Sequence, residues 1–153
     1  MHHFFPSRLP LIFSCLLFAC TAFAQGLQWT KDGNAYWLAD KDGIAQMDFV
    51  SKQNTMIASA AQLTPTGATR PLPIKEFKTS DDGKKILIFT NSQRVWRYET
   101  RGDYWVLDLA SGKLRQLGTT LPAASLMFAK ISPDGNLAAY VSKHNLYLED
   151  LAS

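Results

Sequence analysis

Short hydrophobic runs separated by Gly, Asn and Asp make up most of the chain after its first two dozen residues. Four of these runs are rich in β-branched and aromatic residues and predict strands, at 85–90, 104–109, 137–141 and 146–151. Several runs are apolar on both alternating faces, whereas a sheet with one face in water alternates apolar and polar positions. Helical patterns are nearly absent. The chain is therefore predicted to be all-β, with sheets covered on both faces.

A turn of the form hydroxyl-x-Asp-Gly occurs three times, each time before a predicted strand. Gly tolerates positive φ and Asp can bond back onto its own turn, so the pair reverses the chain tightly. The turn aspartates are 50 and 52 residues apart, at Asp32, Asp82 and Asp134. Strand-rich repeats of about 40–50 residues are typical of β-propeller blades, which stack face to face. We expect a partial β-propeller with about two blades and the start of a third.

The three units differ in length at one place. Each closes with a second aspartate, which follows the turn aspartate by 16 residues in the first and third units and by 26 in the second, at Asp48, Asp150 and Asp108. The middle unit is therefore predicted to carry a ten-residue insertion in the region 91–103. The stretch 63–73, with three prolines, predicts an exposed connection between the first two units.

The N-terminal residues 1–24 have the pattern of a secretory signal peptide. An early cation precedes an apolar run at 11–19, and the segment ends in small-x-small at Ala24. The run is too short to span a bilayer, and two prolines disfavour a buried helix. A lipoprotein cleavage site before Cys20 is the alternative, although Phe18 is bulky for that motif. We expect cleavage after Ala24, a propeller fragment at 25–153, and a periplasmic or secreted protein with no membrane segment when mature.

The composition argues against disulfides, metal sites and nucleic-acid binding. Both cysteines, Cys15 and Cys20, lie in the signal segment, so the mature chain has no disulfide and no thiolate metal site. Without Arg8, 15 of the 16 basic side chains remain against 13 acidic ones, and this scattered net charge of +2 does not indicate nucleic-acid binding. His144 is the one mature histidine, has no clustered carboxylates, and is expected to be a solvated strand-end residue. We predict no metal, no cofactor and no nucleic-acid partner.

The insertion concentrates side chains suited to recognition. Segments that depart from a repeat's norm often carry function in repeat proteins. The Arg97 guanidinium offers a fixed fork of donors for a carbonyl or carboxylate, and the adjacent Trp96 can pack the arginine stem in place. The alternative is a solvated hairpin tip on which Arg97 and Glu99 form weak surface pairs. The residues alone leave both readings open.

Several segments together resemble a known family. The runs 87–91, 95–97 and 104–109 resemble the N-terminal propeller of bacterial dipeptidyl peptidase IV, in the S9 prolyl oligopeptidase clan of serine peptidases. The runs 126–135 and 145–151 fit the next blade of that family. The Trp-Arg pair, at its distance from the following strand, is the more specific part of the resemblance. It implies an eight-bladed propeller covering an α/β-hydrolase domain, in an enzyme that releases dipeptides with Pro or Ala second.

The resemblance also implies roles for two residues. Arg97 matches the arginine that contacts a carbonyl of the bound peptide substrate, and Trp96 matches its aromatic neighbour, with a supporting role only. The paired glutamates and the Gly-x-Ser-x-Gly nucleophile of that family would lie beyond Ser153. We therefore expect the front part of a longer protein, with no catalytic residue and no activity of its own, and with a hydrolase domain in cis. A homodimer of the full-length protein stays open.

A function of another class is the alternative. The chain could belong to a non-catalytic periplasmic β-propeller scaffold that binds protein partners through the insertion. The residues beyond Ser153 would separate the two: paired glutamates and a nucleophile elbow indicate the peptidase, whereas further Asp-Gly repeats alone indicate the scaffold.

Overall fold

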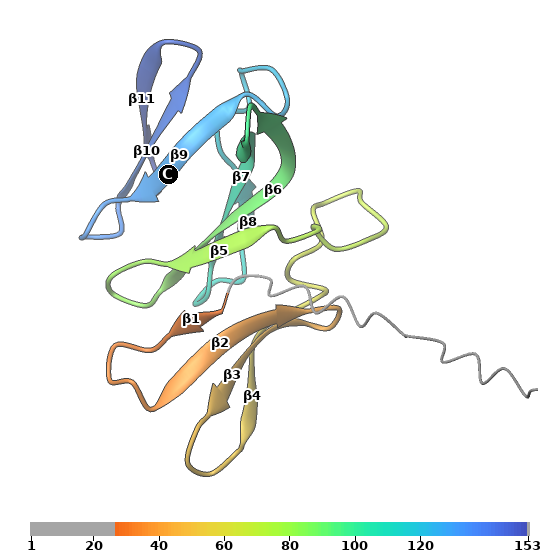
Figure 1. Ribbon diagram of the computed structural model, residues 1–153, viewed down its shortest axis with the longest axis vertical. Coiled ribbons are helices and arrows are strands. Elements are labelled where there is room, and N and C mark those ends of the chain that lie inside the picture. Colours follow the sequence, from red (N-terminus) through yellow and green to blue (C-terminus); the bar gives the residue numbers. More distant parts are fainter. Residues whose placement is uncertain (1–26, 153) are drawn as a thin grey trace, which may run out of the picture.

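The computed structural model describes residues 27–152, which form β-strands joined by turns and loops (Figure 1). The first sheet contains four consecutive antiparallel strands: β1 (Gln28–Trp29), β2 (Ala35–Asp40), β3 (Gly43–Asp48) and β4 (Asn54–Ser59). The second sheet has the order β11-β10-β9-β7-β6-β5, with β8 paired to β7. Its strands are β5 (Glu76–Thr79), β6 (Lys85–Val95), β7 (Tyr98–Asp108), β8 (Leu114–Gln116), β9 (Leu126–Ile131), β10 (Leu137–Ser142) and β11 (Asn145–Asp150).

The strands form three units that lie one above another in Figure 1: β1–β4, β5–β8 and β9–β11. The four predicted strand runs fall in β6, β7, β10 and β11, so the all-β prediction is confirmed. Between residues 27 and 152 there is no helix with the length and apolarity needed to cross a membrane. The predicted signal peptide lies outside the described residues.

The middle unit is buried on both faces, as its apolar pattern predicts. Along β6, Ile86 and Ile88 belong to the cluster shared with the first unit, and Leu87 and Phe89 belong to the cluster shared with the third. All four side chains are at most 6% exposed, and burying a side chain of this size contributes about 1.5–3 kcal/mol to folding. Stacking of the units against one another therefore accounts for the lack of apolar–polar alternation.

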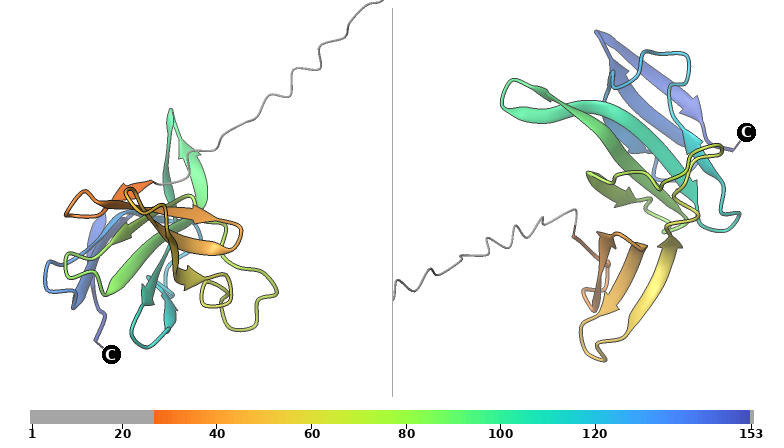
Figure 2. Two further views of the ribbon diagram at one scale, coloured as in Figure 1. Left: turned by 90° about the horizontal axis from the view of Figure 1, so that it is seen from below. Right: turned by 90° about the vertical axis from the view of Figure 1, so that its right-hand side faces the viewer.

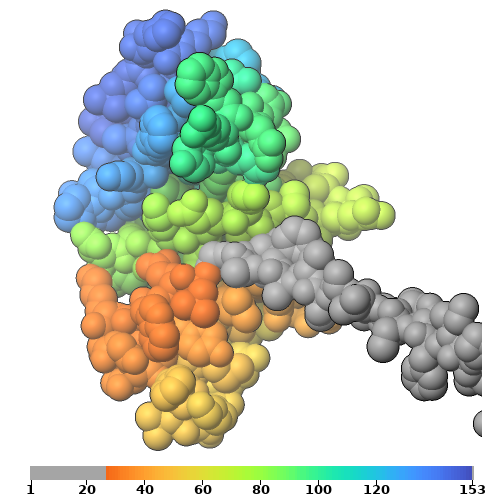
Figure 3. Space-filling view, viewed as in Figure 1, coloured from red at the N-terminus to blue at the C-terminus, as the bar shows by residue number. Residues whose placement is uncertain are grey.

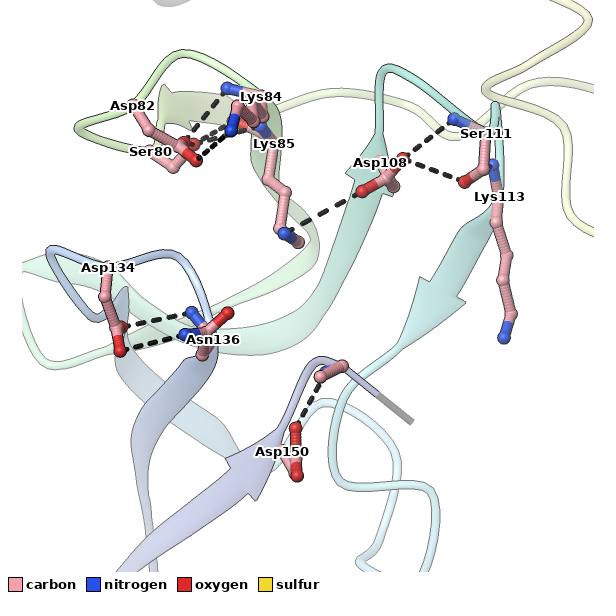
Figure 4. Close-up of polar contacts among 11 residues, drawn as sticks. Ser80, Asp82, Lys84, Lys85, Asp108, Ser111, Lys113, Asp134, Asn136 and Asp150 are labelled. Atoms are coloured by element: carbon pink, nitrogen blue, oxygen red, sulfur yellow. Dashed lines mark hydrogen bonds and ion pairs between the residues drawn. The ribbon is translucent and has the colours of Figure 1, made fainter.

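The Asp-Gly turns form as predicted (Figure 4). In the second unit the Ser80 hydroxyl donates to Asp82 Oδ1 at 2.6 Å, and the Lys84 backbone N–H donates to the same oxygen at 3.1 Å. These bonds to the ionised form, led by the one from the Ser80 hydroxyl, lower the pKa of Asp82. Gly83 takes φ +71°, which favours glycine. The other two turns repeat the arrangement around Asp32 with Gly33, and around Asp134 with Gly135.

The closing aspartates also cap their turns. Asp108 Oδ1 accepts hydrogen bonds from the Ser111 backbone N–H and hydroxyl, both at 2.8 Å (Figure 4), and Asp48 is bonded to Ser51 in the same way. Each unit is then sealed by one backbone bond back to the residue after its turn glycine. These bonds join Phe49 N to Asn34 O, Leu109 N to Lys84 O, and Leu151 N to Asn136 O.

The ten-residue insertion is confirmed and takes the form of longer strands. The hairpins β2–β3 and β10–β11 have strands of six residues, whereas β6 and β7 have eleven residues each, which adds five residues to each strand. Figure 2 shows the green end of the β6–β7 hairpin projecting clear of the sheets. The insertion therefore extends a regular element of the blade.

The connection 63–73 differs from its prediction at the first residue. Leu63 is 1% exposed and packs in the core between the first two units, because burying its apolar side chain there removes it from water. The Leu72 N–H donates to the Leu63 carbonyl at 2.9 Å and closes the loop, and most residues between them are exposed. The Pro73 carbonyl accepts from the Thr90 hydroxyl at 2.7 Å, which anchors the loop to β6.

Candidate functional site

The tip of the β6–β7 hairpin is a two-residue turn made of Trp96 and Arg97. Val95 pairs with Tyr98 and closes it. Trp96 has φ +61° whereas Arg97 keeps a negative φ, the pattern of a type II′ turn, which prefers Gly at its first central position. A bulky side chain in this conformation is strained, and such residues concentrate at functional sites. Trp96 is therefore a residue that the geometry of this turn does not favour.

Both predicted site residues are exposed at this tip. The Trp96 side chain is 94% exposed, so it makes little contact with the Arg97 stem, and its supporting role stays a prediction. Within residues 27–152, no hydrogen bond or ion pair engages the Arg97 guanidinium. By contrast, Arg101 on the same hairpin donates from Nη2 to Gln93 Oε1 at 3.2 Å. Figure 3 shows the green atoms of this hairpin at the surface, next to the blue third unit.

Glu99 has partners other than Arg97. Its Oε2 accepts from the Ser92 hydroxyl at 2.8 Å and forms an ion pair with Lys75 Nζ at 2.8 Å. The Lys75 ammonium, followed by the Ser92 hydroxyl, holds the pKa of Glu99 below its ordinary value. The weak Arg97–Glu99 surface pair of the alternative interpretation is therefore not formed. Glu99 braces the side of the hairpin and leaves the arginine unengaged.

At its base the hairpin packs closely against the blade. The Phe89 and Tyr104 rings stack with centroids 4.7 Å apart, and Gly102 lies next to Phe89 in space. A Cβ atom at Gly102 would stand 2.5 Å from Phe89 Cε2, so this approach requires glycine. Burial raises the pKa of the Tyr104 hydroxyl.

The hairpin base also pairs with the third unit. Arg101 lies opposite Met127 and Gly102 lies opposite Leu126, which joins β7 to β9 and merges the second and third units into one sheet. Sequence analysis did not anticipate this pairing. The available signal was the Gly at position 102, because an isolated glycine in a strand pattern indicates close approach of another segment.

A hollow of about 220 Å³ lies beside the hairpin base. Its lining combines aromatic side chains with charged ones, and includes Phe89, Tyr104, Phe128, Glu76, Lys78, Glu99 and Lys130. Phe128 has φ +56° and is 60% exposed. Sequence analysis did not predict a hollow at this place.

The remaining candidate from the sequence, His144, is exposed in the turn between β10 and β11. Over the described range 27–152 no three His, Cys, Asp or Glu side chains gather in a way that could hold a metal ion. The described site therefore offers the positively charged Arg97 guanidinium, which can donate hydrogen bonds to a partner molecule.

Comparison with known proteins places this hairpin within a matched region. Residues 80–153 match the family model of the dipeptidyl peptidase IV N-terminal region. A protein described as a probable dipeptidyl-aminopeptidase B from Aspergillus niger is 26% identical over 126 residues, covering 82% of this chain and 14% of that protein. Its counterpart from Neosartorya fischeri is 36% identical over 74 residues, covering 48% of this chain and 8% of that protein.

Comparison of structures gives the same fold. The crystal structure of Porphyromonas gingivalis dipeptidyl peptidase 4 matches with a TM-score of 0.70 at 20% identity, covering 84% of this chain and 18% of that one. The chain thus spans less than a fifth of the length of these relatives. The prediction of a partial β-propeller is confirmed, and the match of residues 80–153 to the dipeptidyl peptidase IV N-terminal region supports the resemblance identified from the sequence.

Proposed function

We propose that this chain is the N-terminal propeller portion of an exported serine-type dipeptidyl peptidase. The full-length protein would release X-Pro or X-Ala dipeptides from the N-termini of peptides. A hydrolase domain in the same polypeptide would supply the nucleophile, and the part described would contribute Arg97 for orienting the substrate. The family match over residues 80–153 supports this proposal, because that region contains the hairpin.

The observation that carries the proposal is the state of the Arg97 guanidinium. It lies at the tip of a hairpin that projects from the propeller unit, and no group between residues 27 and 152 engages it. Arginine presents several N–H donors in a rigid fork, and a bond from a cation to a carbonyl is stronger than a neutral one. A peptide carbonyl that reaches the tip would therefore be held in a defined orientation.

Substitution of Arg97 in the full-length protein tests this role. Arg97→Ala removes a charge-assisted bond that contributes about 1.5–3 kcal/mol, so kcat/KM for a chromogenic X-Pro dipeptide substrate should fall roughly 10- to 100-fold. Arg97→Lys keeps the charge but loses the fork and should give an intermediate value. Arg101→Ala is the matched control, because Arg101 stands on the same hairpin but is bonded to Gln93.

The control should stay within about twofold of wild type. If Arg97→Ala also stays within twofold, Arg97 does not orient the substrate. If the full-length protein hydrolyses no X-Pro or X-Ala substrate, the peptidase assignment itself fails, and the scaffold alternative gains support.

We further propose that residues 1–24 direct export and are cleaved after Ala24, which gives a periplasmic or secreted protein. The apolar run and the small-x-small ending support this proposal. N-terminal sequencing of the mature protein should begin at Gln25. A chain that begins at Met1 would contradict export, and a lipid-modified Cys20 would indicate the lipoprotein alternative.

A further inference from the structure

The Asp103 carboxylate stands where the long hairpin leaves the second unit, and it binds two different segments. Oδ2 accepts a hydrogen bond from Asn91 Nδ2 at 2.7 Å, across the hairpin. Oδ1 accepts from the Ala124 backbone N–H at 2.7 Å, just before β9. One side chain on β7 therefore ties together β6, β7 and the start of the third unit.

Both partners of Asp103 lie at irregular points of the backbone. Asn91 has φ +47° and Ala124 has φ +52°, a left-handed conformation that non-glycine residues seldom adopt. The β6–β7 register shifts between Thr90 and Gln93, directly at Asn91. A bulge of this kind bends the strand and increases its twist, so the direction of the hairpin beyond it depends on how the bulge is held.

The bond from Ala124 to Asp103 is better shielded from water than the other brace of the hairpin, whereas the bond from Asn91 is exposed. The Lys75–Glu99 pair has side chains that are 52% and 35% exposed, and such a surface pair contributes little. Asp103 is half-buried and Ala124 is only 3% exposed. Loss of the Asp103 carboxylate would leave the buried Ala124 N–H without its acceptor, which a folded protein avoids.

The length of the hairpin amplifies any change at its base. Arg97 lies six positions before Asp103, which corresponds to a lever of about 20 Å in an extended strand. A rotation of about 10° at the base would therefore move the tip by about 3.5 Å. A misplacement of about 1 Å at a group that orients a substrate can already cost a large rate factor.

We infer that Asp103 is a positioning residue for Arg97: by bonding the bulge at Asn91 and the loop at Ala124 together, it sets the direction in which the arginine is presented. This inference rests on the proposed function. Asp103 acts on the substrate only through the hairpin, and its effect should therefore disappear when the Arg97 guanidinium is absent.

A double-mutant cycle in the full-length protein tests this dependence. Asp103→Ala should lower kcat/KM for an X-Pro substrate about tenfold when Arg97 is present, and less than twofold in the Arg97→Ala background. Asn91→Ala removes the bond to Oδ2, keeps the bond to Oδ1 and adds strain at a φ of +47°. It should give a smaller loss with the same dependence on Arg97. It serves as the second variant if Asp103→Ala fails to fold.

Asp108→Ala is the matched control. Asp108 lies at the end of the same strand that is remote from the hairpin tip, and its carboxylate also accepts hydrogen bonds in a turn, from Ser111. Its replacement should lower the melting temperature as Asp103→Ala does. Any change that it makes in kcat/KM should be the same factor with and without the Arg97 guanidinium.

The outcomes separate the inference from the proposed function. If Arg97→Ala leaves kcat/KM unchanged, the proposed function fails and the inference falls with it. If Arg97→Ala lowers kcat/KM but Asp103→Ala and Asn91→Ala each act by the same factor in both backgrounds, the proposed role of Arg97 stands. Asp103 is then only a structural residue, and the inference is overturned.

Discussion

Gly102 is the residue at which one added methyl group should disturb the hairpin most. An alanine Cβ at this position would lie 2.5 Å from Phe89 Cε2 and 2.6 Å from the Thr90 carbonyl oxygen. The φ of Gly102 lies outside the left-handed region, so an alanine could adopt this backbone without conformational cost. The cost of Gly102→Ala is therefore steric alone.

Neither neighbour can move away easily. The Phe89 ring is stacked on Tyr104 with centroids 4.7 Å apart, and Thr90 lies in the β6–β7 ladder opposite Asp103. Overpacking of a well-packed site costs about 1–3 kcal/mol. At the middle of this range, about 2 kcal/mol, the population of opened hairpin would rise about 30-fold.

Hydrogen–deuterium exchange of the full-length protein measures this opening directly. Amide exchange in peptides that span 89–103 should become about 30-fold faster in Gly102→Ala, because exchange follows the local opening free energy. Gly83→Ala is the control: its Cβ would meet nothing within 4 Å, and its cost comes from the φ of +71°. That control should change exchange around the turn at 80–83 and leave the hairpin base unchanged.

The steric argument makes one further distinction. A larger side chain should worsen the effect at Gly102, so Gly102→Val should open the hairpin more than Gly102→Ala. At Gly83, Asn tolerates positive φ and Gly83→Asn should be milder than Gly83→Ala. Exchange at 89–103 that changes less than threefold in Gly102→Ala would refute the close packing described at the hairpin base.

Two more predictions concern other turns and pH. Lys52 has φ +58° at the position that Gly112 occupies in the second unit. Lys52→Gly should therefore stabilise the fold by about 0.5–1 kcal/mol, although the contact of the Lys52 ammonium with the Phe49 ring is lost. A lower midpoint in urea unfolding would contradict this prediction. Burial and the hydrogen bond to Glu149 raise the pKa of Tyr140 to about 12, which favours the neutral hydroxyl in the folded state. The contribution of Tyr140 to stability should be complete below pH 10 and be lost as pH rises towards 12. In Tyr140→Phe the free energy of unfolding should therefore fall less steeply with pH in this window. A pH profile identical to that of the wild type would contradict the assignment.

Local chemistry made the repeat units predictable from the sequence. The Asp-Gly turns depend on neighbouring residues only: a hydroxyl, a carboxylate and a glycine within four positions, as at Ser80–Gly83. The two-sided burial of β6 was predictable because it appears as an unbroken apolar run, and the length of the insertion followed from the spacing of two aspartates. The role of Arg97 was predicted through resemblance, since spacing alone left it open, and it stays a prediction.

Contacts between distant segments were not predictable in the same way. The pairing of Gly102 with Leu126 and the bond from Ala124 to Asp103 join residues more than 20 positions apart. No periodic pattern in the sequence predicts such contacts, because the pairing depends on how far the long hairpin bends. The burial of Leu63 was missed for a related reason, since neighbouring prolines indicated a loop while the gap between two units determined its exposure.

The backbone bond that seals each unit has a consequence for how such proteins can diverge. All three bonds, including the one from Leu109 to Lys84, lie at the end of the unit opposite its hairpin tip. Residues can therefore be added at the tip in matched numbers on both strands without disturbing closure of the unit. One rim of the molecule is free to acquire new recognition elements over evolutionary time, while the other rim keeps the architecture constant.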